Sequence, residues 1–217
     1  LRFDDGSSAF LSRTPAGASN QKTWTFSAWI KPSNVTISRS IFARHDSGSN
    51  TFLFRLDQND DLQVENYTSG AYQLHLVTDA KFRDTSAWYH VVLSLDTTQG
   101  TAANRAKLYV NGVQQTSLSA STYPSENADL KVNAAAVHRI GARSSNNYFD
   151  GYMAEVNFVD GTQLAPTSFG ETKNGVWIPI DTSGLTFGTN GFRLDFADNA
   201  VDAPTSEGTE DTDNIGS

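Results

Sequence analysis

The chain has 217 residues, a formal net charge of −8, one methionine and no cysteine. Seven acidic residues and no lysine or arginine lie from position 195 onward, so residues 1–194 are close to neutral. A near-neutral body with an acidic end argues against a nucleic-acid partner. Without cysteine the chain forms no disulfide and no thiolate metal site. No apolar run approaches the roughly 20 residues that span a membrane, so we expect no membrane insertion.

Short apolar segments recur about every ten residues with turn residues between them, which is typical of a β-sandwich or barrel. The expected strands cover residues 1–3, 9–13, 23–31, 39–43, 51–57, 62–67, 72–78, 88–96, 107–112, 137–142, 152–159 and 192–196. The sequence favours no helix longer than one turn, at 163–169. The chain is therefore predicted to be all-β.

Alternation of side chains predicts which residues enter the core. In segment 23–31, Trp24, Phe26, Ala28 and Ile30 share one face. The large aromatic residues that we expect to be mostly core are Trp24, Phe26, Phe52, Phe54, Trp88 and Tyr89. Asn111-Gly112 closes segment 107–112, and both residue types accept the positive φ that a two-residue hairpin turn requires.

Seven motifs follow one another along the first 165 residues. They are LRF at 1–3, AFL at 9–11, WTFSAWIK at 24–31, WYHV at 88–91, LYVNG at 108–112, IG at 140–141 and GYMAEV at 151–156. Their order resembles the laminin-G-like domains of the concanavalin A-like lectins and glucanases. The resemblance implies a jelly roll over residues 1–166, an antiparallel two-sheet β-sandwich with one concave sheet. It also implies ligands held by loops at the rim, sometimes through calcium.

Residues 158–171, 174–179 and 190–196 resemble segments that follow such jelly rolls in structural and tail-fibre proteins of tailed bacteriophages. This resemblance implies a non-enzymatic adhesion module at the virion surface, outside the cell. Its partners would be a host-surface glycan, other virion proteins and further copies of itself, for example in a trimer. We expect residues 167–196 to pack on the sandwich and residues 197–217 to form an acidic linker toward a further part of a longer chain.

Two alternatives to adhesion remain open. The first is a purely structural domain that packs against other virion subunits. The second is a polysaccharide-degrading glycosidase, because glucanases of this fold place Glu-x-Asp-x-x-Glu on one strand. In this chain the middle acid of that motif is replaced by Asn157, which cannot assist by charge. The last acid corresponds to Asp160, which precedes Gly161 as in a turn. We therefore expect no enzymatic activity.

Oxygen-rich loops are the candidates for binding. Asp57, Asn59, Asp60 and Asp61 lack the spacing of an EF-hand and are better explained as a turn. The loops at 45–50, 99–105 and 144–148 are expected to gather at one rim, with Asp46 and Asn104 as possible calcium ligands. The four histidines, His45, His75, His90 and His138, share no zinc-binding spacing and are interpreted as structural.

Exposed tyrosines beside amide side chains are suited to stacking on sugars or to anchoring an interface. Tyr67, Tyr72, Tyr123 and Tyr148 have such neighbours, although each one alone is more often an ordinary loop-packing residue. The predicted ligand-binding residues are Asp46, Asn50, Asn104, Asn146, Asn147, Tyr148 and Tyr72.

Overall fold

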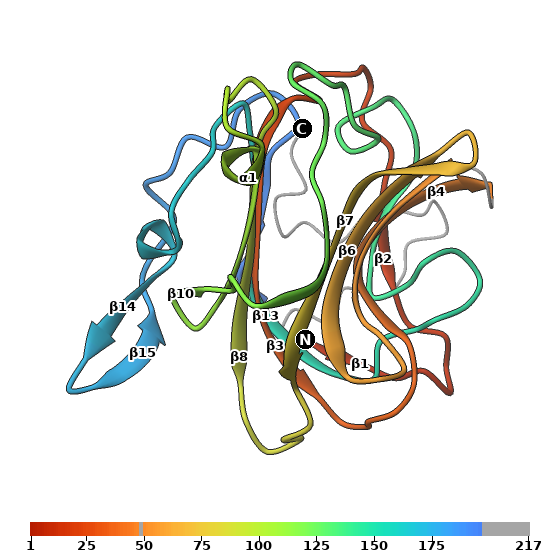
Figure 1. Ribbon diagram of the computed structural model, residues 1–217. Coiled ribbons are helices and arrows are strands. Elements are labelled where there is room, and N and C mark those ends of the chain that lie inside the picture. Colours follow the sequence, from red (N-terminus) through yellow and green to blue (C-terminus); the bar gives the residue numbers. More distant parts are fainter. Residues whose placement is uncertain (48–49, 197–217) are drawn as a thin grey trace.

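Two antiparallel sheets packed face to face form the body of the protein in the computed structural model (Figure 1). The structure describes residues 1–47 and 50–196, so the predicted acidic linker at 197–217 lies outside the described residues. The predicted all-β jelly-roll sandwich is confirmed. Among the described residues, no helix has the length and hydrophobicity needed to cross a membrane.

Sheet A has seven strands. In spatial order they are β1 (Arg2–Phe3), β13 (Gly151–Asp160), β3 (Thr23–Pro32), β8 (Tyr89–Asp96), β9 (Ala106–Val110) and β10 (Val113–Gln114), with β16 (Phe192–Leu194) also paired to β13. The short helix α1 (Ala102–Arg105) connects β8 to β9. Asn111 and Gly112, with φ of 49° and 79°, form the predicted two-residue turn between β9 and β10.

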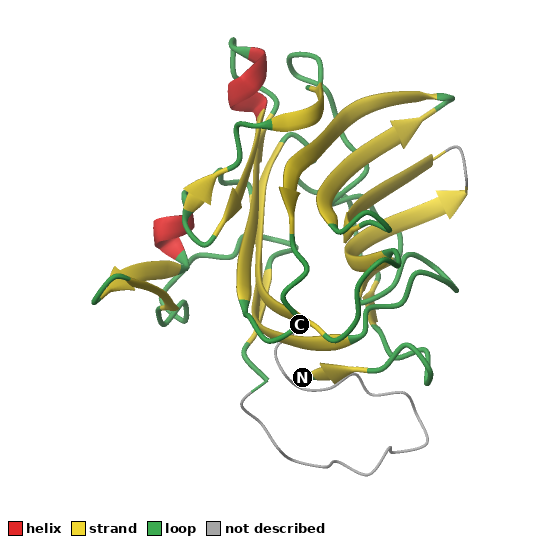
Figure 2. Cartoon of the chain, turned by 60° about the horizontal axis from the view of Figure 1, so that its bottom comes forward, coloured by secondary structure: helices red, strands yellow, loops and turns green. Residues whose placement is uncertain are grey.

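Sheet B also has seven strands. Their order is β11 (Leu118–Thr122), β7 (Ala71–Lys81), β6 (Asp61–Thr68), β5 (Asn50–Leu56), β4 (Arg39–Ser47), β12 (His138–Ile140) and β2 (Leu11–Arg13). Strands β6 and β7 bow toward sheet A in their middle, which makes the outer face of sheet B concave (Figure 1). The same curvature is visible after rotation in Figure 2. The resemblance implied one concave sheet, and this is sheet B.

Aromatic side chains fill the space between the sheets. Trp24, Phe26, Ala28 and Ile30 of β3 are all fully buried, as alternation predicts. The Phe26 ring stacks on Phe42 of sheet B with ring centroids 4.7 Å apart. Each such buried ring contributes about 2–3 kcal/mol through apolar burial.

Two aromatic residues differ from their predicted positions. Trp88 was expected in the core but remains 41% exposed, because it precedes β8 by one residue and alternates with Tyr89. The Tyr89 ring instead packs on Phe82 at 5.3 Å. Tyr123 was expected to present an exposed ring but packs against the core.

Residues that follow β13 cover the outer face of sheet A. Val92, Val159 and Phe169 form a second buried cluster there. Beyond the short turn η1 (Pro166–Ser168), strands β14 (Gly170–Lys173) and β15 (Val176–Pro179) form a hairpin that projects from the body (Figure 1). The Trp177 ring of this hairpin lies against Gly112.

Candidate functional site

The outer face of sheet B carries its side chains in rows, because strands β7, β6, β5, β4 and β12 are paired in register. The first row is Tyr72, Tyr67, Thr51 and His45, and the second is His75, Glu65, Leu53, Ala43 and Arg139. A third, shorter row is Val77, Gln63 and Arg55. Side chains at alternate positions, among them Phe52, Val64 and Leu76, point into the core.

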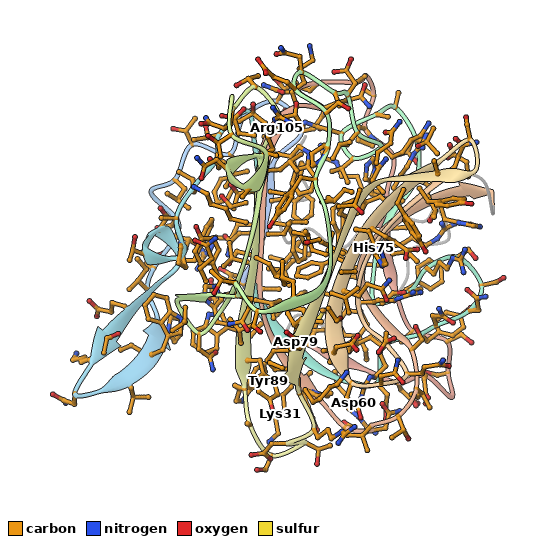
Figure 3. All side chains as sticks on the ribbon, in the orientation of Figure 1. Lys31, Asp60, His75, Asp79, Tyr89 and Arg105 are labelled. Atoms are coloured by element: carbon orange, nitrogen blue, oxygen red, sulfur yellow. The ribbon has the colours of Figure 1, made fainter. Side chains whose placement is uncertain are left out.

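One end of this face is aromatic. The Tyr72 ring lies parallel to the His75 imidazole, with centroids 4.2 Å apart, and meets the Tyr67 ring edge-on at 5.0 Å. Tyr72 is 45% exposed. Burial raises the pKa of Tyr72 and lowers the pKa of His75, so both rings are uncharged near neutral pH. The two stacked rings form a flat, neutral platform with Tyr72 toward solvent. Figure 3 shows the position of His75 on sheet B.

A polar network lies beside the platform. Gln63 Oε1 accepts hydrogen bonds from Arg55 Nε at 3.2 Å and Nη2 at 3.0 Å. Its Nε2 donates to Glu65 Oε2 at 3.1 Å and lies 2.8 Å from His75 Nε2. Because the amide nitrogen only donates, His75 Nε2 accepts and the imidazole proton is on Nδ1. These contacts fix the plane of the ring under Tyr72.

Tyr72 is the predicted binding residue that lies directly on this face. Asp46 is near the end of β4 and pairs with Arg44, with 2.7 Å between Oδ2 and Nη2. Asn50 begins β5, is half-buried and pairs with Thr68 of β6.

The remaining predicted residues lie elsewhere. Asn104 belongs to α1 beside sheet A, and its carbonyl accepts a hydrogen bond from Gln163. Asn146, Asn147 and Tyr148 follow β12, and the Asn147 carbonyl accepts from Ser40 N at 2.9 Å. The Tyr148 ring lies 6.4 Å from Phe10.

The three loops do not gather at one rim as predicted. Residues 144–148 are hydrogen-bonded near Ser40, at the beginning of β4, whereas residues 45–50 include the opposite end of that strand. The 99–105 segment belongs to the connection between β8 and β9 of sheet A. The loop after β12 therefore continues along β4 toward the beginning of that strand. Asp46 and Asn104 lie beside different sheets.

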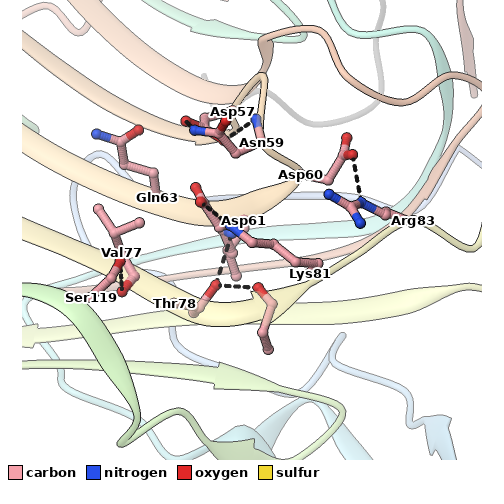
Figure 4. A network of polar contacts seen from close by, with 12 residues as sticks. Asp57, Asn59, Asp60, Asp61, Gln63, Val77, Thr78, Lys81, Arg83 and Ser119 are labelled. Carbon is pink, nitrogen blue, oxygen red and sulfur yellow. Dashed lines mark hydrogen bonds and ion pairs between the residues drawn. The ribbon is translucent and has the colours of Figure 1, made fainter.

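The acidic segment 57–61 forms a turn (Figure 4). Asp57 Oδ1 accepts from Asn59 N at 2.6 Å, which is ordinary turn chemistry. The buried Asp60 carboxylate pairs with Arg39 at 2.9 Å and Arg83 at 3.1 Å. Asp61 pairs with Lys81 at 2.6 Å. Both carboxylate oxygens of Asp60 and one oxygen of Asp61 are therefore paired with cations, which would compete with a calcium ion.

The acids of the glucanase-like segment are also engaged. Glu155 pairs with Arg193 at 3.2 Å, and Asp160 is buried and accepts hydrogen bonds from the Asn133 side chain and Asn190 N. Asn157 Oδ1 accepts from Thr182 at 2.9 Å. Among the described residues, one cluster of three carboxylates has metal-binding spacing, Asp4, Asp5 and Asp150, and its first two members are exposed.

Sequence reasoning identified Tyr72 but missed His75, Gln63, Glu65 and Arg55. No spacing along the chain signals that these residues meet, because they come from three strands. Alternation within β6 does place Gln63, Glu65 and Tyr67 on one face. This pattern is the sequence feature that could have indicated a polar and aromatic surface there.

Comparisons with known proteins agree with this architecture. One similar solved structure is domain 4 of AbnA, an extracellular arabinanase from Geobacillus stearothermophilus, in complex with arabinotriose. Its TM-score is 0.50 at 19% identity, over 67% of this chain and 64% of that one. The chain therefore spans less than two thirds of that domain.

Two further structures are similar at lower scores. A heptameric pentraxin from Limulus polyphemus has a TM-score of 0.49 at 14% identity, over 72% of this chain and 71% of that one. The sialidase module CBM40 from Ruminococcus gnavus has a TM-score of 0.46 at 15% identity, over 72% of this chain and 95% of that one. No match was found among curated proteins.

A family model described as the concanavalin A-like lectin/glucanases superfamily matches residues 4–166. The match begins after β1 and ends after β13, so it includes the strands of both sheets except β1 and β16. The two curved sheets and this match together show that the chain belongs to the concanavalin A-like lectin/glucanase superfamily.

Proposed function

We propose that this protein is a non-enzymatic, glycan-binding adhesion module and that glycans bind on the concave face of sheet B. The observation that carries the proposal is the half-exposed Tyr72 ring, held flat on His75 beside the Arg55–Gln63–Glu65 network. Membership of a lectin/glucanase superfamily supports it. The similarly folded domain 4 of AbnA, which was solved in complex with arabinotriose, also supports the proposal.

The chemistry of this face suits a sugar. A pyranose or furanose ring has a face of C–H groups that stacks on an aromatic ring, and hydroxyl groups at its edge that need hydrogen-bond partners. Tyr72 supplies the ring. Arg55 and Glu65 supply a donor and an acceptor. Gln63, whose amide hydrogens and oxygen are already engaged, holds them in fixed positions, which lowers the entropy cost of binding.

We further propose that the module is displayed on the virion surface of a tailed bacteriophage, in a tail or capsid fibre or similar appendage. The support is the resemblance of residues 158–171, 174–179 and 190–196 to segments of phage structural proteins. There it contacts a host-surface glycan and neighbouring virion proteins. A homo-oligomer such as a trimer suits a fibre.

A purely structural role in virion packing is the second candidate. Its support is the β14–β15 hairpin, which projects from sheet A and leaves Val176 60% exposed, while Val113 beside Gly112 is 65% exposed. Apolar side chains on a projecting element are typical of a protein interface. A glycosidase is the third and weakest candidate, because Glu155 is tied to Arg193.

The test compares two tyrosines of nearly equal exposure on different sheets. Tyr72 is 45% exposed on sheet B, and Tyr152 is 43% exposed on sheet A. Wild type, Tyr72→Ala and Tyr152→Ala are applied to a microarray of bacterial surface oligosaccharides, and hits are titrated by calorimetry. We expect Tyr72→Ala to weaken binding about 10-fold or more and Tyr152→Ala to leave it unchanged.

Each outcome decides between the candidates. No binding by folded wild type, or equal binding by both variants, contradicts glycan recognition on this face. Imaging the intact particle at side-chain resolution then tests the structural role, which requires the β14–β15 hairpin to be buried against another subunit. Release of reducing ends from a host polysaccharide, abolished by Glu155→Gln, would support the glycosidase.

A further inference from the structure

Two arginines at the β12 end of sheet B have no acidic partner among the residues that the structure describes. Arg139 is on β12, and Arg143 lies in the segment that follows it. Among the described residues, neither guanidinium forms an ion pair or a hydrogen bond, and the Nε atom of each is buried. The similarly unpaired Arg2 differs, because it is exposed to solvent.

Most other arginines of the chain are neutralised. Arg39, Arg44, Arg55, Arg83, Arg105 and Arg193 each pair with an aspartate or glutamate. A partly buried guanidinium is costly when its donors lack acceptors, so two such groups four residues apart in the chain indicate a place for an anion.

Arg139 faces the concave side, and Arg143 follows it by four residues. His138 and Ile140 point into the core, so Arg139 between them points outward, where its guanidinium lies 5.8 Å above the Phe10 ring. His45, outward on β4, is 3.3 Å from Thr51 Oγ1 through Nδ1. Burial lowers the pKa of His45, and the positive charges of Arg143 and Arg139 lower it further.

The cationic end and the aromatic end lie on the same side of sheet B, and the outward residues between them, Ala43, Leu53 and Glu65, are at most 6% exposed. Arg139 on β12 and His75 on β7 are joined through Ala43, Leu53 and Glu65, which is four strand spacings. At about 4.8 Å for each spacing this is about 19 Å, so an oligosaccharide rather than a single sugar would reach both ends.

We propose that Arg139 and Arg143 bind the acidic group, a carboxylate or a sulfate ester, of one sugar in an oligosaccharide, several residues along from the sugar that stacks on Tyr72. The inference rests on the proposed glycan-binding function and narrows it to acidic oligosaccharides. The planar guanidinium of arginine suits such oxoanions because it donates two parallel hydrogen bonds.

The first experiment tests the anion site without requiring an intact glycan ligand. The side-chain Nε–Hε signals of arginine are followed by NMR during addition of sodium glucuronate, glucose 6-sulfate, inorganic sulfate or neutral glucose. We expect the signals of Arg139 and Arg143 to shift with glucuronate, glucose 6-sulfate or both, and not with glucose. Signals that respond to none of these anions overturn the proposal, and an equal response to inorganic sulfate assigns an adventitious anion site only.

The second experiment measures affinity for oligosaccharides prepared as the acid and as the carboxyl-reduced alcohol. We expect the acid to bind wild type about 10-fold or more tightly than the alcohol, and Arg143→Gln or Arg139→Gln to remove that difference. Arg2→Gln, which changes net charge equally on sheet A, should preserve it. Equal binding of both forms overturns the acidic inference while leaving glycan binding intact, whereas failure of both forms to bind counts against the proposed function itself.

Discussion

The indole N–H of Trp177 donates a hydrogen bond of 3.0 Å to Nδ1 of His90, which joins the β14–β15 hairpin to the middle of sheet A. Trp177 Nε1 only donates, so His90 Nδ1 accepts and Nε2 carries the proton that reaches Ser27 Oγ at 2.8 Å. Trp29 stacks on the same imidazole at 4.9 Å. His90 is therefore a neutral structural residue at the hairpin's attachment point.

Stability should fall in mild acid because of buried histidines. Burial lowers the pKa of His90 to about 3 and of His138 to about 4, from 6.5. Below pH 6.5 the unfolded chain binds protons that the folded chain does not, so the free energy of unfolding decreases toward pH 4. The slope approaches about 1.4 kcal/mol per pH unit for each histidine. Urea unfolding at a series of pH values from 7 to 4 measures this pH dependence of the free energy of unfolding. The same pH dependence in His90→Gln would contradict a contribution from His90.

Removing the indole donor should loosen the hairpin. Trp177→Phe leaves His90 Nδ1 buried without a donor, which costs about 1–3 kcal/mol. Hydrogen exchange of the β14–β15 amides should accelerate together with this loss. Val176→Ala, a change of a 60% exposed side chain on the same hairpin, serves as the control and should have little effect.

Two glycines in equivalent turns separate backbone strain from steric clash. Gly112 has φ of +79°, and a Cβ there would lie 2.7 Å from the Trp177 ring. Gly175 has φ of +80° with nothing within 4 Å. Gly175→Ala should cost only the left-handed backbone penalty of about 1–2 kcal/mol, and Gly112→Ala should cost more. Equal melting temperatures for the two variants would show that Trp177 does not pack tightly on the turn.

Breaking the buried ion pair beneath the acidic turn should be among the most damaging single changes. Asp60→Asn leaves Arg39, whose side chain is fully buried, without its charged partner. The expected loss is about 3–5 kcal/mol in chemical unfolding. Asp79→Asn on the neighbouring strand, where the side chain is exposed, is the comparison and should stay close to wild type.

Calcium removal should leave thermal stability unchanged. Asp46 is paired with Arg44, and Asn104 lies beside the other sheet, so these two predicted ligands do not form a common site. A decrease in melting temperature with EDTA would contradict this expectation. Loss of that decrease in Asp150→Asn would then place the ion at Asp4, Asp5 and Asp150.

Alternation along single strands was sufficient to predict most of the core. Trp24, Phe26 and Ile30 are buried because a strand sends every second side chain to the same face, and no knowledge of neighbours is needed. The exception, Trp88, lies outside the ordered alternation of β8.

The site was harder to predict because it depends on register between strands. An irregularity between Asn66 and Tyr67 places Tyr72 opposite Tyr67 and leaves His75 opposite Glu65. No sequence pattern within β6 or β7 reports that shift. Arg139 and Arg143 were missed for a related reason, since a lone arginine gives no sign of whether an acid lies across the sheet.

Strands β1 and β16 both pair with the same edge of β13 and run in the same direction. Strand β1 pairs with Tyr152 and Gly151 of β13, and β16 pairs with residues 156–158 of β13. The end of β16 at Leu194 therefore faces the beginning of β1 at Leu1 along this edge. Tension applied between these two ends would peel two short strands from β13, one hydrogen bond after another. Such peeling requires less force than shearing long strands, and it would leave the concave face of sheet B outside the load path.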